Sequence, residues 1–415
     1  MAKVKGKHRV RRFFKWFFIV IIGLVVLLYA TVFIGHKFLF KLHSTNQPTI
    51  AAVSSSNYRF GAAARTQPKT MLGYVKVVSS QVKNYNEHLN NYWPNNPQKN
   101  QYLIAQDVKT KTAYLVNPSG EYKKLTSKQF DSYNVPSTMQ VTGEWNPFSG
   151  NGIEGAYITV SPQALSNYYV YQRYEHLGTY DQFLSYSHEL FHTITQKNWG
   201  DSKYGNLNRD ERLSDSTGRR SRMLLMQQLS LAITDTANRD THIKDALATY
   251  NQYEKQDKKD YDASILYDRL EGTAFYYELK SALYAAYPNQ VKNESEVYPA
   301  ITALLKNDNP AYRATGAVTE AYKVGGYAGI LLDLKSMENN QDPNDWKNEV
   351  AKDGDATPLT LLAKEYEGQT LPSPQTIPTK QAYKKWIGAY NKIDPINSQP
   401  AIIFNVLYAW LYGGE

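Results

Sequence analysis

Cysteine is absent from this sequence of 415 residues. The chain therefore has no disulfide, and thiolate metal sites and cysteine nucleophiles are excluded. Histidine is scarce, with eight residues in all, so two histidines at a regular spacing are informative. Acidic residues are missing from the whole N-terminal part of the chain, where Glu87 is the first of 38.

The formal net charge of +9 arises at the N-terminus. Residues 1–41 hold nine Lys or Arg and no acid, which leaves 38 basic and 38 acidic residues in the rest of the chain. Because the excess charge lies in one terminal segment and not on a folded face, we expect no nucleic-acid partner.

An uncharged run of 20 residues follows the basic segment, from Trp16 to Gly35. Such a run at helical rise spans a hydrocarbon core of about 30 Å. The seven basic residues before it predict that residues 1–15 are cytoplasmic and that the C-terminal domain is extracellular. We therefore expect a single-pass cell-membrane protein with an anchor at residues 16–35. A cleaved signal peptide is the alternative, but its apolar region is usually shorter, and no A-x-A-like site directly follows this run.

A linker is predicted between the anchor and the folded part, at residues 36–69. Its section 44–69 is rich in Ser, Thr, Ala and Gln and has little apolar periodicity, which favours a stalk. Arg59, Arg65 and Lys69 could contact an anionic cell-envelope polymer, but a solvated linker is the preferred interpretation.

The remaining chain predicts an α+β fold, with a small mixed α/β part at residues 70–179 and a mainly helical part at 180–415. A helical pattern from residue 71 to about 93 precedes runs that alternate like strands, at residues 101–108, 112–117, 138–143 and 155–160. From about residue 180 almost everything indicates helix, apart from loops such as 371–379. The apolar segment 401–412 is too short to span a membrane, and we expect it to pack into the core.

Residues 188–192 read His-Glu-Leu-Phe-His, an H-E-x-x-H pattern. In a helix over residues 181–197, His188 and His192 are four apart and share one face, so both imidazoles can reach one metal ion. Glu189 beside them can accept a proton from a water molecule that the metal activates. Two unrelated histidines on one helix are the alternative interpretation. A catalytic zinc takes three protein ligands and keeps a fourth position for water, so the chain must supply a third ligand.

The best third ligand lies in the predicted helix at residues 266–283. Glu271 and Glu278 fall along one face of it, and small residues after Glu271 would let a second helix approach closely. Ordinary solvated carboxylates are the alternative for both glutamates. Asp201 is a weaker candidate ligand, and His242 has no supporting context.

Residues 271–278 read Glu-Gly-Thr-Ala-Phe-Tyr-Tyr-Glu and fit the pattern E-G-x-A-x-Y-x-E. Together with residues 188–192 and the segment YKVGGYAGILL at 322–332, they resemble the motifs of aminopeptidase N-like gluzincins, which are HExxH zinc metallopeptidases. The resemblance covers roughly residues 150–340 and implies a thermolysin-like zincin core with one zinc ion. It implies that Glu271 binds zinc and that Tyr322 stabilises the tetrahedral intermediate of peptide hydrolysis.

The sequence departs from that family in two ways. As many as 78 residues separate His192 from Glu271, where the family has a short interval. The G-A-M-E-N motif that binds the substrate amine is missing, and residues 152–160 stand in its place as the expected edge strand for a peptide substrate. Aminopeptidase activity therefore does not follow.

The resulting hypothesis is a membrane-anchored extracellular zinc peptidase that cleaves a peptide or protein substrate. Glu189 would serve as the general base, and Glu278 would either orient a ligand histidine or form a surface ion pair. A non-catalytic binding or adhesion protein on the same scaffold is the second hypothesis, and a structural zinc site is the third. Glu189 favours catalysis because a binding protein needs no base, and a structural site would prefer four protein ligands.

Overall fold

The computed structural model contains two compact units, one formed by residues 1–47 and 391–415 and the other by residues 48–390. The residues that it describes are 20–21, 23–35, 53–54, 59–60, 70–135, 145–160, 181–207, 215–306, 317–393 and 407.

The first unit contains part of the predicted anchor. Residues 23–35 are helical, and apolar side chains such as Leu24 and Val26 are exposed along them. Across the described residues, no helix is both long enough and apolar enough to cross a membrane. The predicted basic segment 1–15, the start of the anchor and all of segment 401–412 except Leu407 lie outside the described residues.

Within the predicted linker, the described residues form two short strands, β1 (Val53–Ser54) and β2 (Arg59–Phe60), which pair antiparallel. Other residues of 36–69 lie outside the described part of the chain.

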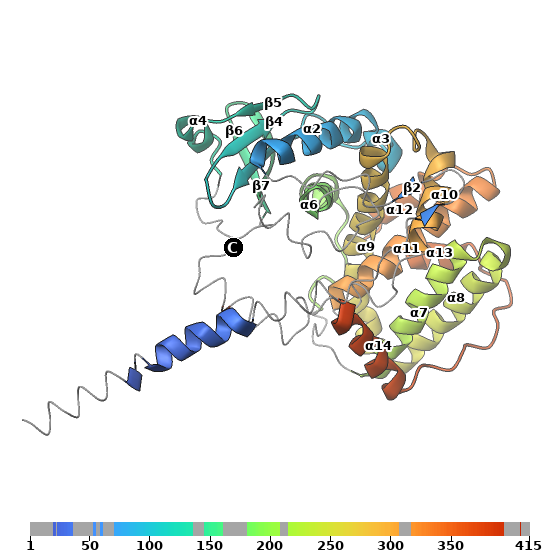
Figure 1. Cartoon of the computed structure of the whole chain (residues 1–415). Coiled ribbons are helices and arrows are strands. Elements are labelled where there is room, and N and C mark those ends of the chain that lie inside the picture. Colours follow the sequence, from blue (N-terminus) through green and yellow to red (C-terminus); the bar gives the residue numbers. More distant parts are fainter. Residues whose placement is uncertain are drawn as a thin grey trace, which may run out of the picture. The chain divides into compact units, whose positions relative to one another are not determined.

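A mixed sheet lies in the N-terminal part of the second unit (Figure 1). The order of its described strands is β5-β4-β3-β7-β6. The strands are β3 (Tyr102–Asp107), β4 (Ala113–Val116), β5 (Tyr122–Lys124), β6 (Trp145–Gly150) and β7 (Ile153–Val160). Only β3 and β7 run parallel, with Ile104 opposite Tyr157, and the other pairs are antiparallel. Of the predicted strand-like runs, 138–143 lies outside the described residues.

The prediction that residues 152–160 form an edge strand is wrong. Strand β7 lies inside the sheet, between β3 and β6, so β6 takes the edge. The cause is a tight hairpin at Asn151 and Gly152, whose φ angles of 52° and 75° suit the two central residues of a type I′ turn. Pro147 lies in β6, where an edge strand tolerates the missing N–H.

Helices make up the rest of the second unit, which confirms the predicted α+β class with a mainly helical second part. Helices α2 and α3 precede the sheet, α4 lies between β5 and β6, and the others follow β7. The helices are α2 (Met71–Glu87), α3 (Leu89–Tyr92), α4 (Ser127–Asp131), α6 (Asp181–Leu190), the π-helical turn η4 (Phe191–Thr195), the 3₁₀ turns η5 (Gln196–Asn198) and η6 (Thr236–Asn238), α7 (Thr217–Thr234), α8 (Arg239–Gln256), α9 (Lys258–Ala286), α10 (Glu294–Leu305), α11 (Ala317–Glu338), α12 (Asp345–Lys352), α13 (Pro358–Lys364) and α14 (Lys380–Ile393).

Helix α9 is the centre of the helical part. Its 29 residues extend about 43 Å at helical rise. It packs against α2, α6, α8, α10, α11 and α13, so its residues are buried on almost every side and not along one stripe. Asp257 caps its start by accepting a hydrogen bond from the backbone N–H of Asp260. Both glutamates of the candidate site project from this helix.

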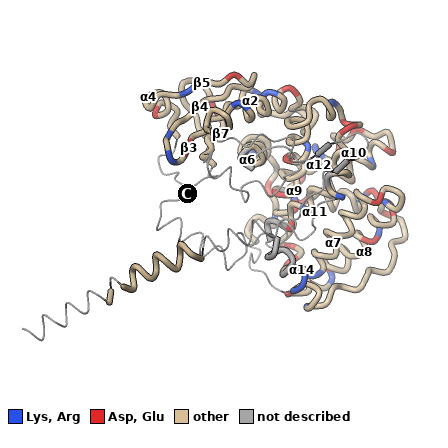
Figure 2. The backbone as a smooth tube through the Cα atoms, viewed as in Figure 1, with Lys and Arg blue, Asp and Glu red and all other residues tan. Residues whose placement is uncertain are grey.

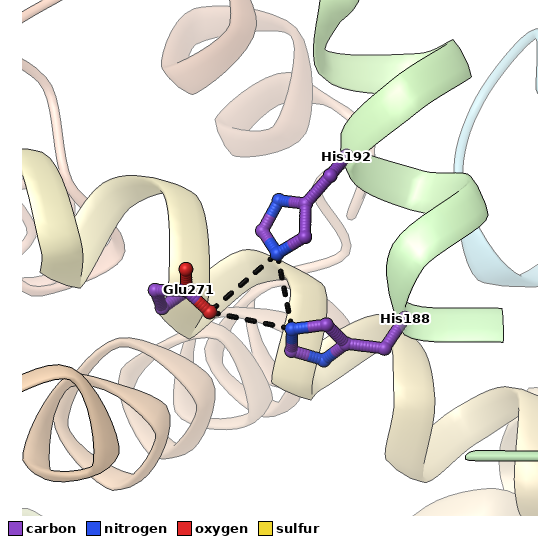
Figure 3. Close-up of side chains that lie close together, drawn as sticks. All are labelled: His188, His192 and Glu271. Atoms are coloured by element: carbon purple, nitrogen blue, oxygen red, sulfur yellow. Dashed lines mark hydrogen bonds and ion pairs between the residues drawn. The ribbon is translucent and has the colours of Figure 1, made fainter. Parts of the chain in front are cut away.

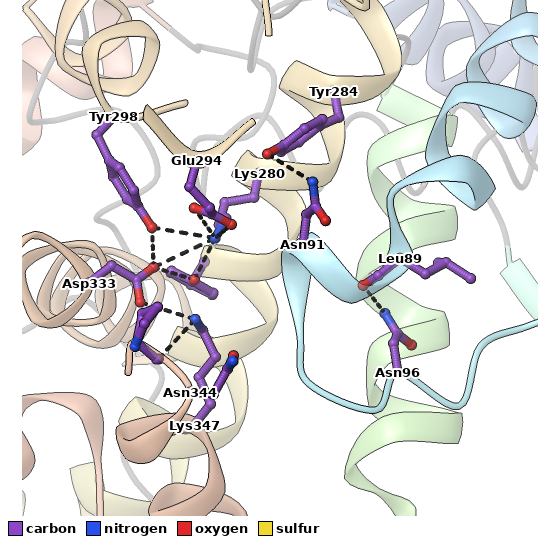
Figure 4. Close-up of polar contacts among 12 residues, drawn as sticks. Leu89, Asn91, Asn96, Lys280, Tyr284, Glu294, Tyr298, Asp333, Asn344 and Lys347 are labelled. Carbon is purple, nitrogen blue, oxygen red and sulfur yellow. Dashed lines mark hydrogen bonds and ion pairs between the residues drawn. The ribbon is translucent and has the colours of Figure 1, made fainter. Parts of the chain in front are cut away.

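A buried polar network fastens the second half of α9 to the neighbouring helices (Figure 4). The carboxylate of Asp333 on α11 accepts hydrogen bonds from Tyr298 at 2.5 Å and Lys347 at 3.0 Å. Lys280 on α9 donates to both oxygens of Glu294 at 2.8 and 2.9 Å. Burial would raise the pKa of Asp333, but the charges of Lys347 and Lys280 outweigh it and hold that pKa below its ordinary value. The network therefore joins α9, α10, α11 and α12 around a carboxylate whose charged form is favoured.

Charged residues of both signs are scattered over the described helices and strands (Figure 2). This agrees with the equal numbers of basic and acidic residues beyond residue 41.

Candidate metal centre

The H-E-x-x-H residues lie where α6 passes into η4. His188 belongs to the last turn of α6, and His192 belongs to the π-helical turn that follows. Phe183, Leu190 and Phe191 are fully buried and hold this segment in the core. A π-helical turn inside a helix is rare and is often found at functional sites, because it re-aims the side chains that follow.

Three donor atoms meet between this segment and α9 (Figure 3). The Nε2 atoms of His188 and His192 lie 3.0 Å apart, and Oε2 of Glu271 lies 3.3 Å from the first and 3.5 Å from the second. Three ligands at zinc distances of about 2.0–2.1 Å with tetrahedral angles would lie about 3.3–3.4 Å from one another. The triangle therefore has the size of three tetrahedral ligands, and this buried His-His-Glu group could hold a metal ion.

The centre is open on one side. The side chain of His188 is 7% exposed, whereas those of His192 and Glu271 are 22% and 23% exposed. Solvent can therefore approach the group from the side of His192 and Glu271. Three protein ligands with solvent access are typical of a catalytic site, because a structural zinc site is closed by a fourth ligand.

Glu278 fixes the orientation of His188. It lies two turns beyond Glu271 on α9, and its Oε2 lies 3.0 Å from Nδ1 of His188. The side chain of Glu278 is 3% exposed, so the alternative of a surface ion pair is wrong. When Nδ1–H donates to this carboxylate, the lone pair of Nε2 points at the triangle.

Gln196 fixes the orientation of His192. Its Oε1 accepts a hydrogen bond of 2.6 Å from Nδ1 of His192, while its Nε2 donates to the carbonyl of Leu270 and to Oγ1 of Thr273, both at 2.8 Å. Because both amide hydrogens have acceptors on α9, only the amide oxygen can face the imidazole. Both histidines are thus set with Nε2 free to bind a metal.

The carboxylates of Glu271 and Glu278 favour the charged form of His188. Burial disfavours the charged form of His188, but the hydrogen bonds with Glu271 and Glu278 outweigh burial and raise its pKa to about 9. Burial likewise opposes the charge of Glu271, and its hydrogen bonds with His188 and His192 outweigh that and lower its pKa. A metal ion that binds Nε2 of His188 must therefore compete with a proton.

Glu189 and Tyr322 are both neighbours of His188, Glu189 in the sequence and Tyr322 in space. Glu189 directly follows His188 on α6 and is partly exposed. The ring of Tyr322 on α11 meets the His188 ring edge-on, with 5.3 Å between the centroids, and stacks on Phe275 at 5.8 Å. Tyr322 is partly buried, so its ring packs in the core beside the triangle.

Two glycines bring α9 and α11 together next to the ligand Glu271. A Cβ atom on Gly272 would lie 2.5 Å from the Cα of Gly325, and one on Gly325 would lie 2.2 Å from the carbonyl oxygen of Asp268. Neither contact is compatible with a side chain, so only glycine permits this crossing. The crossing places Tyr322, one turn before Gly325, near the same side of α9 as Glu271.

The weaker candidate ligands lie apart from the triangle. Within the described residues, the metal-ligand group consists of His188, His192 and Glu271 alone. Asp201 is exposed, and Nε2 of His242 lies 3.1 Å from Oδ2 of Asp235.

Gln196 was missed at the level of the sequence. Its position four residues after His192, on the same helical segment, was a usable signal, because residues four apart on a helix contact each other. Its contacts with Leu270 and Thr273 depend on the packing of α9, which no local pattern indicates.

No protein-family model, no curated protein and no solved structure matches this chain. The relationship to gluzincins therefore stays a prediction, and the metal centre is inferred from the geometry of the side chains.

Loss of either orienting side chain should weaken metal binding without removing a ligand. We expect Glu278→Ala and Gln196→Ala each to lower zinc affinity by roughly 10–100-fold, the usual cost of losing an outer hydrogen-bond partner. Competition titration against a chromophoric zinc chelator measures the change.

Gln101→Ala is the matched control, since Gln101 is an equally buried amide that binds Glu154 at 3.0 Å on the sheet. If Glu278→Ala and Gln196→Ala bind zinc as tightly as the control Gln101→Ala, then Glu278 and Gln196 do not act on the metal centre.

Proposed function

We propose that this chain is a zinc-dependent peptidase that is anchored in the cell membrane and acts outside the cell. The observation that carries the proposal is the triangle of His188, His192 and Glu271. Glu278 and Gln196 orient the two imidazoles through their Nδ1 atoms, and solvent can approach the triangle from one side. A partly exposed Glu189 beside it supplies the base that hydrolysis requires.

Zinc fits this donor set better than the main competitor. Two histidines and one carboxylate also form the facial triad of mononuclear iron oxygenases. Those sites have no need of a glutamate next to the first histidine, whereas peptide hydrolysis uses it as a base. Glu189 in the H-E-x-x-H pattern therefore supports zinc and hydrolysis.

The proposed reaction uses few residues. His188, His192 and Glu271 would hold the ion, and a bound zinc ion would lower the pKa of a water molecule and polarise the carbonyl to be cleaved. Glu189 accepts the proton of the attacking water and returns it to the leaving amine. Tyr322 donates a hydrogen bond to the developing oxyanion, a contact whose loss typically raises the barrier by about 2.7–4 kcal/mol.

The sheet supports a peptide as the substrate. Strand β6 is the edge next to α6, and in the described part of the chain it pairs only with β7. An extended peptide can add to such an edge through backbone hydrogen bonds. The peptide would then lie beside the helix that carries Glu189.

Digestion of a diverse peptide library by the purified full-length chain tests this function. We expect cleavage that stops when a chelator removes the metal and returns on addition of zinc. A zinc-loaded chain that cuts nothing would favour the non-catalytic binding or adhesion protein.

The location outside the cell is tested separately, on intact cells. The basic residues before Trp16 predict that the large domain is accessible to external protease, because basic flanks remain in the cytoplasm. We expect loss of the full-length band by immunoblot, with a cytoplasmic protein as the protected control. A protected domain, or one released with a new N-terminus near residues 36–45, would contradict the anchor.

A further inference from the structure

Two arginines of α7 are fully buried in a place that the proposed reaction does not use. Arg219 and Arg222 are 2% and 0% exposed, and both lie in the long interval between His192 and Glu271. A buried guanidinium is costly to desolvate, so it is retained only where its partners are well placed.

The partners of these arginines are carboxylates on the two helices that cross beside the metal centre. Arg222 binds Asp268 of α9 through Nη1 at 2.9 Å and Nη2 at 2.5 Å, and its Nε binds Glu320 of α11 at 3.2 Å. Arg219 adds an ion pair of 2.9 Å to the same Oε2 of Glu320. Asp268 and Glu320 are 1% and 0% exposed. Two arginines and two carboxylates thus form one buried cluster.

The cluster is close in sequence to two residues of the metal centre. Asp268 lies one turn before Glu271 on α9, and Glu320 lies two residues before Tyr322 on α11. The backbone carbonyl of Asp268 is also the atom that Gly325 approaches at the crossing. One guanidinium therefore binds both helices at the point where they touch, and its planar fork fixes their distance and their rotation.

We propose that Arg222 is a positioning residue, which sets Glu271 and Tyr322 against the ligand histidines by clamping α9 to α11. The inference rests on the proposed function. It gives α7, which lies in the sequence between the two ligand motifs, the role of holding α9 and α11 together beside the metal centre. A small rotation of α9 would move the Glu271 carboxylate out of the triangle, and a misplacement of 1 Å can cost about 100-fold in rate.

The test compares Arg222→Lys and Arg222→Met with Lys347→Met, all in the full-length chain. Lys347 is also buried and pairs with an α11 carboxylate, Asp333, but it lies away from the triangle. The measurements are zinc affinity, the visible spectrum of the cobalt(II)-loaded protein, kcat and KM, and the midpoint of thermal unfolding.

We expect both Arg222 variants to bind zinc about 10-fold or more weakly, to shift the cobalt bands and to lower kcat with little change in KM. Lys347→Met should lower the unfolding temperature at least as much and leave the cobalt spectrum and zinc affinity unchanged. If Arg222→Met does not fold, Arg222→Lys decides, because lysine keeps the charge but cannot bridge two carboxylates as a fork.

Wild-type affinity, spectrum and kcat in folded Arg222→Lys would overturn the inference and leave Arg222 a stabilising residue only. The peptidase proposal fails by a different result, a wild-type chain that binds zinc and cuts nothing. In that case the cobalt spectrum and zinc affinity of the Arg222 variants still decide whether the clamp positions the centre.

Discussion

Glu189→Gln should abolish peptide hydrolysis while zinc stays bound. The amide has nearly the same shape as the carboxylate but cannot accept the proton of the attacking water, so kcat should fall by about 10²–10⁴-fold or more. Glu189 is not a member of the ligand triangle, so the fold and the zinc content should be those of the wild type. The two measurements are steady-state cleavage of a peptide that the wild type cuts and zinc analysis of the same sample.

Glu154→Gln is the matched control for this change. Glu154 is an exposed carboxylate at the start of β7, and the proposed reaction gives it no role. It should retain full activity. Equal rates for Glu189→Gln and the wild type would mean that residues 188–192 are not the catalytic centre.

Glu271→Ala should lose the metal. Orienting partners outside the triangle already contribute roughly 10–100-fold to affinity, so removal of a ligand should cost more than about 100-fold. The loss also removes the carboxylate that lies 3.3 and 3.5 Å from the two Nε2 atoms, although Glu278 still contacts Nδ1 of His188. Zinc content after dialysis and affinity by chelator competition both report this.

Asp201→Ala separates the two candidate ligands. Asp201 is exposed and outside the triangle, so its loss should leave the zinc content unchanged. Full zinc in Glu271→Ala, together with loss of zinc in Asp201→Ala, would show that the aspartate is the third ligand.

Local pattern predicted much of the fold, because periodicity and turn residues act over a few positions. The helix from residue 71 and the strands at 102–107, 113–116 and 153–160 lie close to where alternation and helical spacing indicated them. The error at β7 had a readable cause, since Asn-Gly at 151–152 is a strong hairpin signal that reveals the additional strand β6.

The metal centre was predictable to the extent that helical spacing determines it. A spacing of four residues places His188 and His192 on one helical face, and a spacing of seven residues does the same for Glu271 and Glu278. The meeting of those helices depends on packing between segments far apart in the chain. Gln196 joins the histidine segment to Leu270 and Thr273 of α9, and Gly272 lies against Gly325 where α9 meets α11. Neither contact has a local signature.

Anomalous diffraction at the zinc absorption edge, from crystals of the purified chain, tests the central claim most directly, because it identifies the element and its position together. The account predicts a single zinc peak about 2.0–2.2 Å from Nε2 of His188, Nε2 of His192 and a carboxylate oxygen of Glu271. A peak at the iron edge and not at the zinc edge, or a zinc ion bound away from these three side chains, would contradict it.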